Sequence, residues 1–221
     1  MVSTDSNTPM AKAKSERPKK TPQGTAALAR LRKESAGCRN CDLWSRATQT
    51  VFGSGPVSAE LMLVGEQPGD QEDLAGEPFV GAAGKLLRDA LDQAGIDVTK
   101  TYLTNAVKHF KWTPRGKRRI HERPNREEVL ACRMWLDGEI AAVRPKAIVA
   151  LGATAAGALL GLSVRVTKDR GRLFESALAP LVTVTVHPSS ILRAPDSESR
   201  RQAMSDFVAD LKAIAARLRE L

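Results

Sequence analysis

The amino-acid sequence predicts an α/β fold, a three-layer α/β/α sandwich with a central, mostly parallel four-stranded sheet. Three observations lead to this prediction. Short apolar runs typical of buried strands alternate along the chain with stretches of helical periodicity. Successive parallel strands need a crossover, usually a helix, and such helices cover both faces of the sheet. Glycine or polar residues follow each apolar run, as expected where a strand ends in a loop.

Four apolar runs are predicted to be strands. They cover residues 61–64, 102–107, 147–151 and 181–186. Continuous apolar runs such as 61–64 and 147–151 are typical of central parallel strands, because both of their faces are buried. The first run ends directly before Gly65, which is a natural point for the chain to leave the sheet.

Five stretches are predicted to be helices. They run from residue 26 to Gly37, over 85–94 up to Gly95, from Asn125 to Pro145, over 154–160, and over 199–218. Asn125 is a good N-cap because its side-chain oxygen can accept a backbone N–H of the first turn. Pro145 sets the end of that helix, since the residue before a proline disfavours helical backbone.

Length and composition indicate one domain, expected over residues 25–221, after a disordered basic arm at residues 1–24. Of the 221 residues, 42% are hydrophobic and 27% charged, which is typical of a globular chain with a single core. The arm is rich in Lys, Ser, Thr and Pro and has little to bury. No apolar run approaches the roughly 20 residues that span a bilayer, and no apolar leader is present. We therefore expect a cytoplasmic protein.

Positive charge is concentrated in one segment of the chain. The formal net charge of +9 excludes an acidic solvating protein and favours a polyanionic partner. Residues 108–126 hold one acid, Glu122, and eight basic residues, a net charge of +7; the basic residues are Lys108, Lys111, Arg115, Lys117, Arg118, Arg119, Arg123 and Arg126. Phe110 and Trp112 are interleaved with them. This pattern predicts a surface loop with stacking groups for nucleic acid, and the simpler interpretation is a solvated basic face.

Polar and glycine-rich residues lie after, or near the end of, each of the four predicted strands. They are residues 65–70, Asn105, Gly152 and residues 187–190. Because the carboxyl ends of parallel strands share one edge of a sheet, these segments predict a single ligand-binding crevice. A phosphate loop is excluded, since Phe79 stands in place of its first glycine and Leu86 in place of its Ser or Thr. A dinucleotide fingerprint is unsupported, since Gly53-Ser54-Gly55 precedes a strand.

Three cysteines, two of them in a Cys-x-x-Cys pair, suggest a metal or cluster site. Cys38, Cys41 and Cys132 supply three thiolates, one short of the usual set for an iron-sulfur cluster or a structural zinc. His109 is the natural fourth candidate, because imidazole can replace thiolate on cluster iron. The alternatives are that Cys132 is a small buried helix residue and that His109 is one more polar residue of the basic loop.

Four short motifs together resemble the uracil-DNA glycosylase superfamily, in particular its iron-sulfur members related to family 4. They occupy residues 65–69, 78–81, 104–105 and 187–190, and the resemblance covers about residues 38–218. Within that group, Lys117-Arg118-Arg119-Ile120-His121 resembles the loop of the UdgX type, whose members excise uracil and remain covalently attached to the DNA. Ordinary iron-sulfur members have cysteine where this chain has His109, and UdgX-type members have histidine there.

The resemblance implies a role for each matching residue. The catalytic residues would be His121, Glu66 and His187, and the uracil-binding residues Gln67, Asp70, Phe79 and Asn105. The DNA-binding residues would be Lys117, Arg118, Arg119, Ser189, Ser190 and Arg193, and a 4Fe-4S cluster would be held by Cys38, Cys41, His109 and Cys132. The chemistry suits these types: a flipped base needs an aromatic platform, an amide that reads its edge and a donor for its developing charge.

The expected function is excision of uracil from DNA followed by capture of the abasic sugar at C1′ through His121. The expected partner is uracil-containing DNA, with single strands accepted, and the expected oligomeric state is a monomer. Two alternatives remain at this point. One is a conventional turnover glycosylase in which His121 only contacts DNA, and the other is a non-catalytic iron-sulfur module that binds DNA without cutting it.

Overall fold

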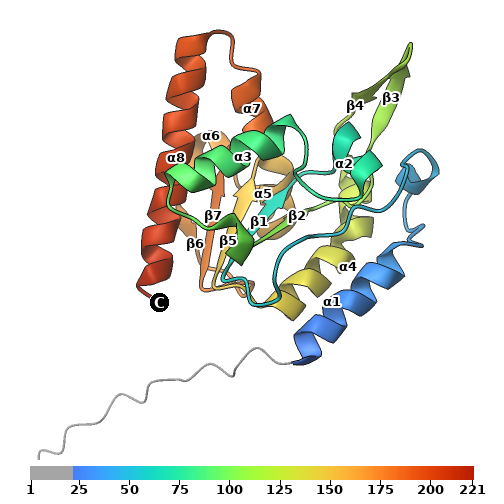
Figure 1. The fold of residues 1–221 in the computed structure, drawn as a ribbon, viewed down its shortest axis with the longest axis horizontal. Helices are drawn as coiled ribbons and strands as arrows, with labels where there is room; N and C mark the ends of the chain where they lie inside the picture. Colours follow the sequence, from blue (N-terminus) through green and yellow to red (C-terminus); the bar gives the residue numbers. More distant parts are fainter. Residues whose placement is uncertain (1–21) are drawn as a thin grey trace, which may run out of the picture.

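The computed structural model describes residues 22–221 and contains a five-stranded sheet between layers of helices (Figure 1). The strands of the sheet are β1 (Leu61–Gly65), β2 (Thr101–Asn105), β5 (Ala147–Leu151), β6 (Leu173–Phe174) and β7 (Leu181–Thr185). Their order is β2-β1-β5-β7-β6; the first four are parallel, and β6 runs antiparallel to β7. The predicted fold class is confirmed, and the predicted count of four strands is wrong by the two-residue edge strand β6.

Strand boundaries differ from the prediction by at most a few residues. Every residue of β1, β2, β5 and β7 is buried, in agreement with the continuous apolar character of β1 and β5, although β2 and β7 also contain threonines. The second strand ends at Asn105 rather than at residue 107, because the backbone N–H groups of Ala106 and Val107 turn to donate to Gly65 and Glu66. β6 lacks a sequence signal, since two residues are too few for a visible alternation.

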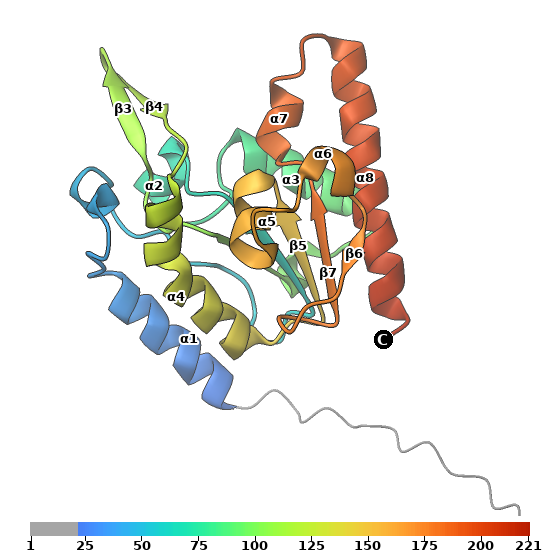
Figure 2. The same cartoon turned by 180° about the vertical axis from the view of Figure 1, so that it is seen from behind.

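The helices form two layers, one on each face of the sheet (Figure 2). The principal helices are α1 (Pro22–Ser35), α3 (Ala82–Gln93), α4 (Arg126–Val143), α5 (Ala153–Leu160) and α8 (Ser197–Arg219). Leu61 and Leu63 of β1 face α3 and α8, whereas Met62 and Val64 face α4 and α5. This period of two along a strand divides the core into two clusters. α1 packs on the outside of α4.

The five predicted helices are all present, and shorter ones were missed. The missed elements are α2 (Asp70–Ala75), α6 (Val166–Asp169), α7 (Pro188–Leu192) and the 3-10 turns Asp42–Ser45 and Val98–Lys100. Asn125 caps α4 as predicted: its Oδ1 accepts the N–H of Glu128 at 2.8 Å. α4 ends at Val143, two residues before Pro145. α1 begins at Pro22, inside the expected arm; the rest of that arm lies outside the described residues.

The basic segment is a β-hairpin, which corrects the prediction of an irregular surface loop. Its strands are β3 (Trp112–Arg115) and β4 (Arg118–His121), paired antiparallel with Trp112 opposite His121. The hairpin projects beyond the sheet, beside α2 (Figures 1 and 2). Four residues of the segment are not on the surface: Lys108, His109, Phe110 and Pro124 are buried. Lys108 Nζ lies 2.6 Å from Glu139 Oε2, so this cation is neutralised inside the fold.

Within residues 22–221, no helix combines the length and apolar character needed to cross a membrane.

Candidate active site

A cleft of about 760 Å³ opens at the carboxyl ends of the parallel strands, where the sequence predicted a crevice. Most of the predicted site residues line it; these are Glu66, Gln67, Phe79, Asn105, His121, His187, Ser189, Ser190 and Arg193. Residues from β1, β2, β4 and α7 therefore meet in one place although they are up to 127 positions apart in the chain. Asp70, Lys117, Arg118 and Arg119 are outside the lining.

The floor of the cleft is set by a close approach of Gly65, Asn105 and Phe79. Gly65 pairs with Asn105 across β1 and β2. A Cβ atom at residue 65 would collide with Oδ1 of Asn105 and with the Phe79 ring. Only glycine leaves room for the amide and the ring to lie against the end of β1. Sequence reasoning named Gly65 as the end of a strand but missed this packing role.

Phe79 is held in a strained backbone conformation. Its φ of 58° lies in the left-handed region, which non-glycine residues seldom adopt. Two neighbours hold it there: Nη1 of Arg88 donates to the Phe79 carbonyl at 2.8 Å, and Gly84 has no Cβ that would strike the same carbonyl. The buried ring stacks on His187 with 6.3 Å between centroids and 27° between planes. The aromatic platform is therefore fixed before any ligand enters.

His187 is a neutral donor built into the wall of the cleft. It precedes α7, and its Nδ1 accepts the backbone N–H of Ser189 at 3.1 Å, with Ser189 Oγ at 2.8 Å. Burial, together with the nearby positive charges of Arg193 and His121, lowers the pKa of His187 to about 4. The ring is thus neutral at pH 7, and the hydrogen bond at Nδ1 assigns its proton to Nε2. A neutral N–H donor results.

His121 stands on the opposite side of the cleft, at the end of β4. Its Nε2 lies 3.4 Å from Oε1 of Glu66, and its side chain is 50% exposed. The other carboxylate oxygen of Glu66 accepts a short hydrogen bond from Thr154, whose Oγ1 also accepts from Nε of Arg123 at 3.1 Å. Glu66 is therefore held in place from α5. Thr154 and Arg123 were missed as site residues, because neither belongs to a recognisable motif.

Gln67 holds the base of the hairpin in place, and its predicted contact with uracil stays a prediction. Its Nε2 donates to the carbonyls of Glu122 at 2.9 Å and Lys111 at 3.2 Å. Its Oε1 accepts the N–H of Lys111 at 3.1 Å. The side-chain amide is fully engaged with the two chain segments that enter and leave the hairpin. It therefore positions the strand that carries His121.

Arg119 and Asp70, predicted to contact DNA and uracil, pair with each other outside the cleft. Nε of Arg119 lies 2.5 Å from Oδ1 of Asp70, and its Nη1 lies 2.6 Å from Oδ2 of the buried Asp73. The guanidinium also lies over the rings of Phe110 and Trp112, at 5.5 and 5.6 Å from their centroids. Arg119 thus ties the hairpin to α2; the contacts of Arg119 with DNA and of Asp70 with uracil stay predictions. Lys117 and Arg118 are exposed at the hairpin turn.

The cysteines gather at the far side of the hairpin from the cleft, in a small apolar cluster with Leu43 and Trp135. Nε1 of Trp135 donates to Sγ of Cys38 at 3.2 Å, and the N–H of Lys108 donates to Sγ of Cys132 at 3.1 Å. Burial raises the pKa of Cys132 to about 12. N–H donors to sulfur are the contacts that stabilise cluster thiolates, so this donor set suits iron-sulfur chemistry.

His109 lies buried beside this cluster, with Nε2 at 2.9 Å from Oγ1 of Thr50. Burial lowers the pKa of the His109 ring. Within residues 22–221, however, no three His, Cys, Asp or Glu side chains are close enough to form a closed ligand set. The four predicted ligands thus have suitable chemistry, but their side chains do not converge on one point where a metal could bind all of them.

Comparison with known proteins gives consistent results. The family model described as the uracil DNA glycosylase superfamily matches residues 52–212. A type-4 uracil-DNA glycosylase of Thermotoga maritima is 38% identical over 171 residues, which cover 77% of this chain and 85% of the relative. Type-4 uracil-DNA glycosylases of Pyrobaculum aerophilum and Archaeoglobus fulgidus are each 37% identical, over 76% and 79% of this chain and 86% and 87% of the relatives.

Proposed function

The chain belongs to the uracil-DNA glycosylase superfamily and acts as a uracil-DNA glycosylase, a hydrolase of N-glycosyl bonds; we propose further that His121 captures the sugar that uracil leaves behind. One observation carries the proposal. The imidazole of His121 enters the same cleft as Phe79, Asn105 and His187 and meets Glu66 at the end of β1. A nucleophile and the groups suited to base departure therefore face the same space.

Departure of the base would use three fixed groups. The Phe79 ring supplies a stacking surface for the flipped base, and the Asn105 amide can pair with the N3–H and O4 edge of uracil. As the bond from C1′ to N1 breaks, its electron pair stays on uracil, and charge spreads onto O2. The Nε2–H of His187 would stabilise this charge by donating a hydrogen bond to O2. The ring is already neutral at pH 7, so it can do so without first releasing a proton.

Capture would follow at the positively polarised C1′. A ring nitrogen of His121 donates its lone pair to C1′ and forms the new C–N bond, which leaves a positive charge on the imidazole. The Glu66 carboxylate, 3.4 Å from Nε2, is placed to compensate that charge or to accept the remaining N–H proton. Thr154 keeps the carboxylate turned toward the ring. If water reached C1′ first, Glu66 would orient it, and the enzyme would turn over.

The test is His121→Ser with uracil-containing single-stranded DNA, analysed by denaturing electrophoresis and by uracil release. We expect wild type to form a complex stable to heat and detergent. The Ser variant should lose the complex yet release uracil at a rate within about tenfold of wild type, because the groups for base departure remain. Free abasic DNA from wild type, without any complex, would favour the turnover alternative. A crosslink mapped to Lys117 would contradict the role of His121.

We also propose that Cys38, Cys41, Cys132 and His109 hold a 4Fe-4S cluster. When bound, it would cross-link three parts of the chain: the segment before β1, the segment after β2, and α4. The hairpin lies between the last two of these in the chain. The contacts in its favour are the apolar cluster that the three cysteines share and the N–H donors to Cys38 and Cys132.

The cluster is tested by iron content and visible absorption after anaerobic purification, with His109→Cys and His109→Ala compared. Both fit the site sterically, but only Cys can ligate iron, so the Cys variant should keep the brown colour and the Ala variant should lose most of it. Thermal stability should follow the absorption. Stoichiometric zinc without iron in wild type would overturn this assignment.

The remaining expectations concern the DNA. We propose that Ser189, Ser190 and Arg193 beside the cleft, and Lys117 and Arg118 at the hairpin turn, contact phosphates next to the flipped nucleotide. We also propose that the protein accepts single-stranded DNA, is a monomer and is located in the cytoplasm. The proposed division of the chain is an arm at residues 1–24 and one domain at residues 25–221. A non-catalytic binding module is disfavoured by the similarity to type-4 enzymes.

A further inference from the structure

A second hollow, of about 810 Å³, lies between α3 and α8, outside the candidate active site. Its lining combines two kinds of side chain. Leu86, Met204 and Val208 make an apolar floor, and the basic residues Lys85, Arg200, Arg201 and Lys212 also line it. We call this hollow the α3–α8 groove.

The cations of the α3–α8 groove are largely without neutralising partners. Within residues 22–221, Lys85, Arg201 and Lys212 form no ion pair or side-chain hydrogen bond, and Arg200 donates only to the carbonyl of Leu192, at 3.0 Å. Asp89 is the one acid among the lining residues. By contrast, Arg170 next to α8 lies 2.8 Å from Asp210, and Arg217 on α8 lies 2.9 Å from Glu220. The groove therefore presents an uncompensated positive field to an anion.

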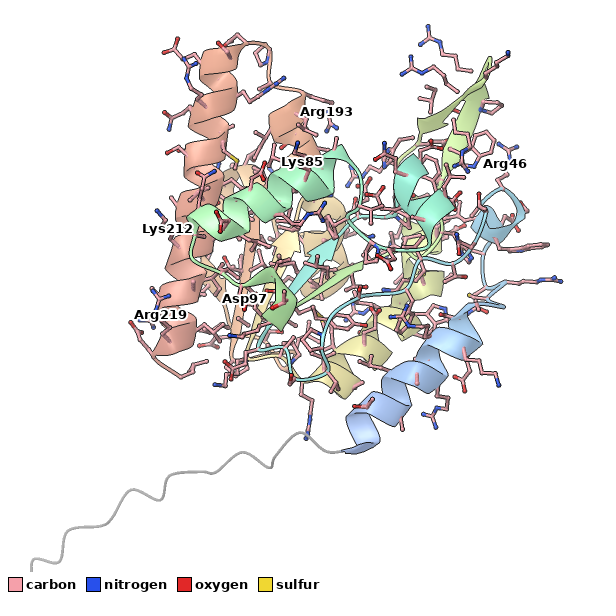
Figure 3. The ribbon with its side chains drawn as sticks, viewed as in Figure 1. Arg46, Lys85, Asp97, Arg193, Lys212 and Arg219 are labelled. Atoms are coloured by element: carbon pink, nitrogen blue, oxygen red, sulfur yellow. The ribbon has the colours of Figure 1, made fainter. Side chains whose placement is uncertain are left out.

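The groove adjoins the candidate active site across the short helix α7. Ser189, Ser190 and Arg193 line the cleft on one side of that helix, whereas Ile191 and Leu192 line the groove on the other. In the view of Figure 3, Lys85 and Arg193 are both labelled toward the end of the molecule that holds α7, and Lys212 lies farther along α8. A strand that leaves the cleft over α7 would enter the groove directly.

We propose that the α3–α8 groove binds the stretch of DNA strand that flanks the flipped uridine on one side. The inference rests on the proposed function, which places the uridine in the cleft. Phosphates would meet the cations, and the sugars and bases would lie on the apolar floor. From Arg201 to Lys212 the helix rises about 16 Å, so the groove cations can reach several successive phosphates of one strand.

The test compares two triple variants with equal loss of charge. The first removes the groove cations (Lys85→Gln, Arg201→Gln, Lys212→Gln), and the control removes exposed cations elsewhere (Lys33→Gln, Lys100→Gln, Arg219→Gln). Arg219 lies at the opposite end of α8 from α7 (Figure 3). The probes are single-stranded oligonucleotides with one uracil, extended by zero, three or six nucleotides on either the 5′ or the 3′ side. Affinity and uracil release are measured at several salt concentrations.

We expect wild type and the control to gain affinity when the oligonucleotide is lengthened on one side only. The groove variant should lose that gain, a drop on the order of 10- to 100-fold, and its salt slope should fall by about 2, as expected for three lost phosphate contacts. Uracil release from the shortest oligonucleotide should be unchanged. An equal loss in both variants, or an unchanged length dependence in the groove variant, would overturn the inference. Absence of uracil release by wild type at every length would instead overturn the proposed function.

Discussion

The two histidines that face the candidate active site are held in contrasting ways. His187 is anchored locally: Ser189, two residues away, fixes its Nδ1, and its ring stacks on Phe79 against the core. His121 is half-exposed on a hairpin that projects from the sheet, and distant residues hold that hairpin. Gln67 binds its base, and Arg119 reaches Asp70 and Asp73 on α2.

This difference matches the chemistry proposed for each side chain. A donor that stabilises charge on a departing base works best when it is neutral and rigid, so that no reorganisation is needed. A nucleophile must approach C1′ as the bond breaks, and a hairpin with a few long-range ties leaves it some freedom to do so. The wall with His187 should therefore control whether uracil leaves, and the hairpin with His121 should control what happens to the sugar.

The largest expected effect on activity comes from replacing His187 in the wall of the cleft. His187→Ala should slow uracil release by about 10²- to 10³-fold, the usual cost of losing one donor to developing charge. Complex formation should slow by the same factor, because capture follows release. Single-turnover assays of both products would measure this. Release that stays at the wild-type rate while the complex is lost would reverse the division of roles.

A second prediction concerns the pH dependence of stability. Because the pKa of His187 is about 4 in the fold and about 6.5 when unfolded, the unfolded chain binds a proton between these values and the folded chain does not. The stabilisation is complete above about pH 6.5 and is lost as the pH falls toward 4, a change on the order of 3 kcal/mol. Denaturant unfolding of wild type and His187→Gln between pH 7 and 4 measures it. Parallel curves for the two proteins would contradict the burial of this ring.

The smallest effect should come from the ties of the hairpin. Arg119→Gln removes the ion pairs to α2 and should reduce the rate of complex formation by about tenfold, equivalent to about 1.4 kcal/mol of positioning, with uracil release changed far less. Arg119→Lys should restore part of the capture, since it keeps the charge. Asp70→Asn, which leaves the Asp73 pair, serves as the matched control. Equal losses of release and capture would show that Arg119 supports the whole fold rather than the position of His121.

Much of the fold and of the cleft could be predicted because the signals are local. Apolar runs marked β1, β2, β5 and β7, and the carboxyl ends of parallel strands necessarily meet at one edge. Residues at or just beyond the ends of those strands, such as Glu66, Asn105 and His187, therefore came together as predicted. Asn125 was recognised as a helix cap for the same reason, since its partner Glu128 is three residues away.

The contacts that the sequence did not predict are those with partners far along the chain. Lys108 was counted as a surface cation, but Glu139, 31 positions later, draws it into the core. The side-chain amide of Gln67 donates hydrogen bonds to carbonyls 44 and 55 positions away. Arg119 pairs with Asp73, 46 positions away. Such pairings leave no periodic pattern, since any basic residue could meet any acid.

The sequence by itself thus determined the residue types of the cleft and the strand ends that carry them, because periodicity and turn chemistry are properties of neighbouring residues. The tertiary structure decided which cations remain exposed to solvent and which are buried or paired with acids inside the fold. It also decided that His121 projects on a hairpin held by distant residues, while the partly buried His187 stacks on Phe79. Those outcomes depend on the approach of distant segments, where burial and ion pairing are settled only once the whole chain is packed.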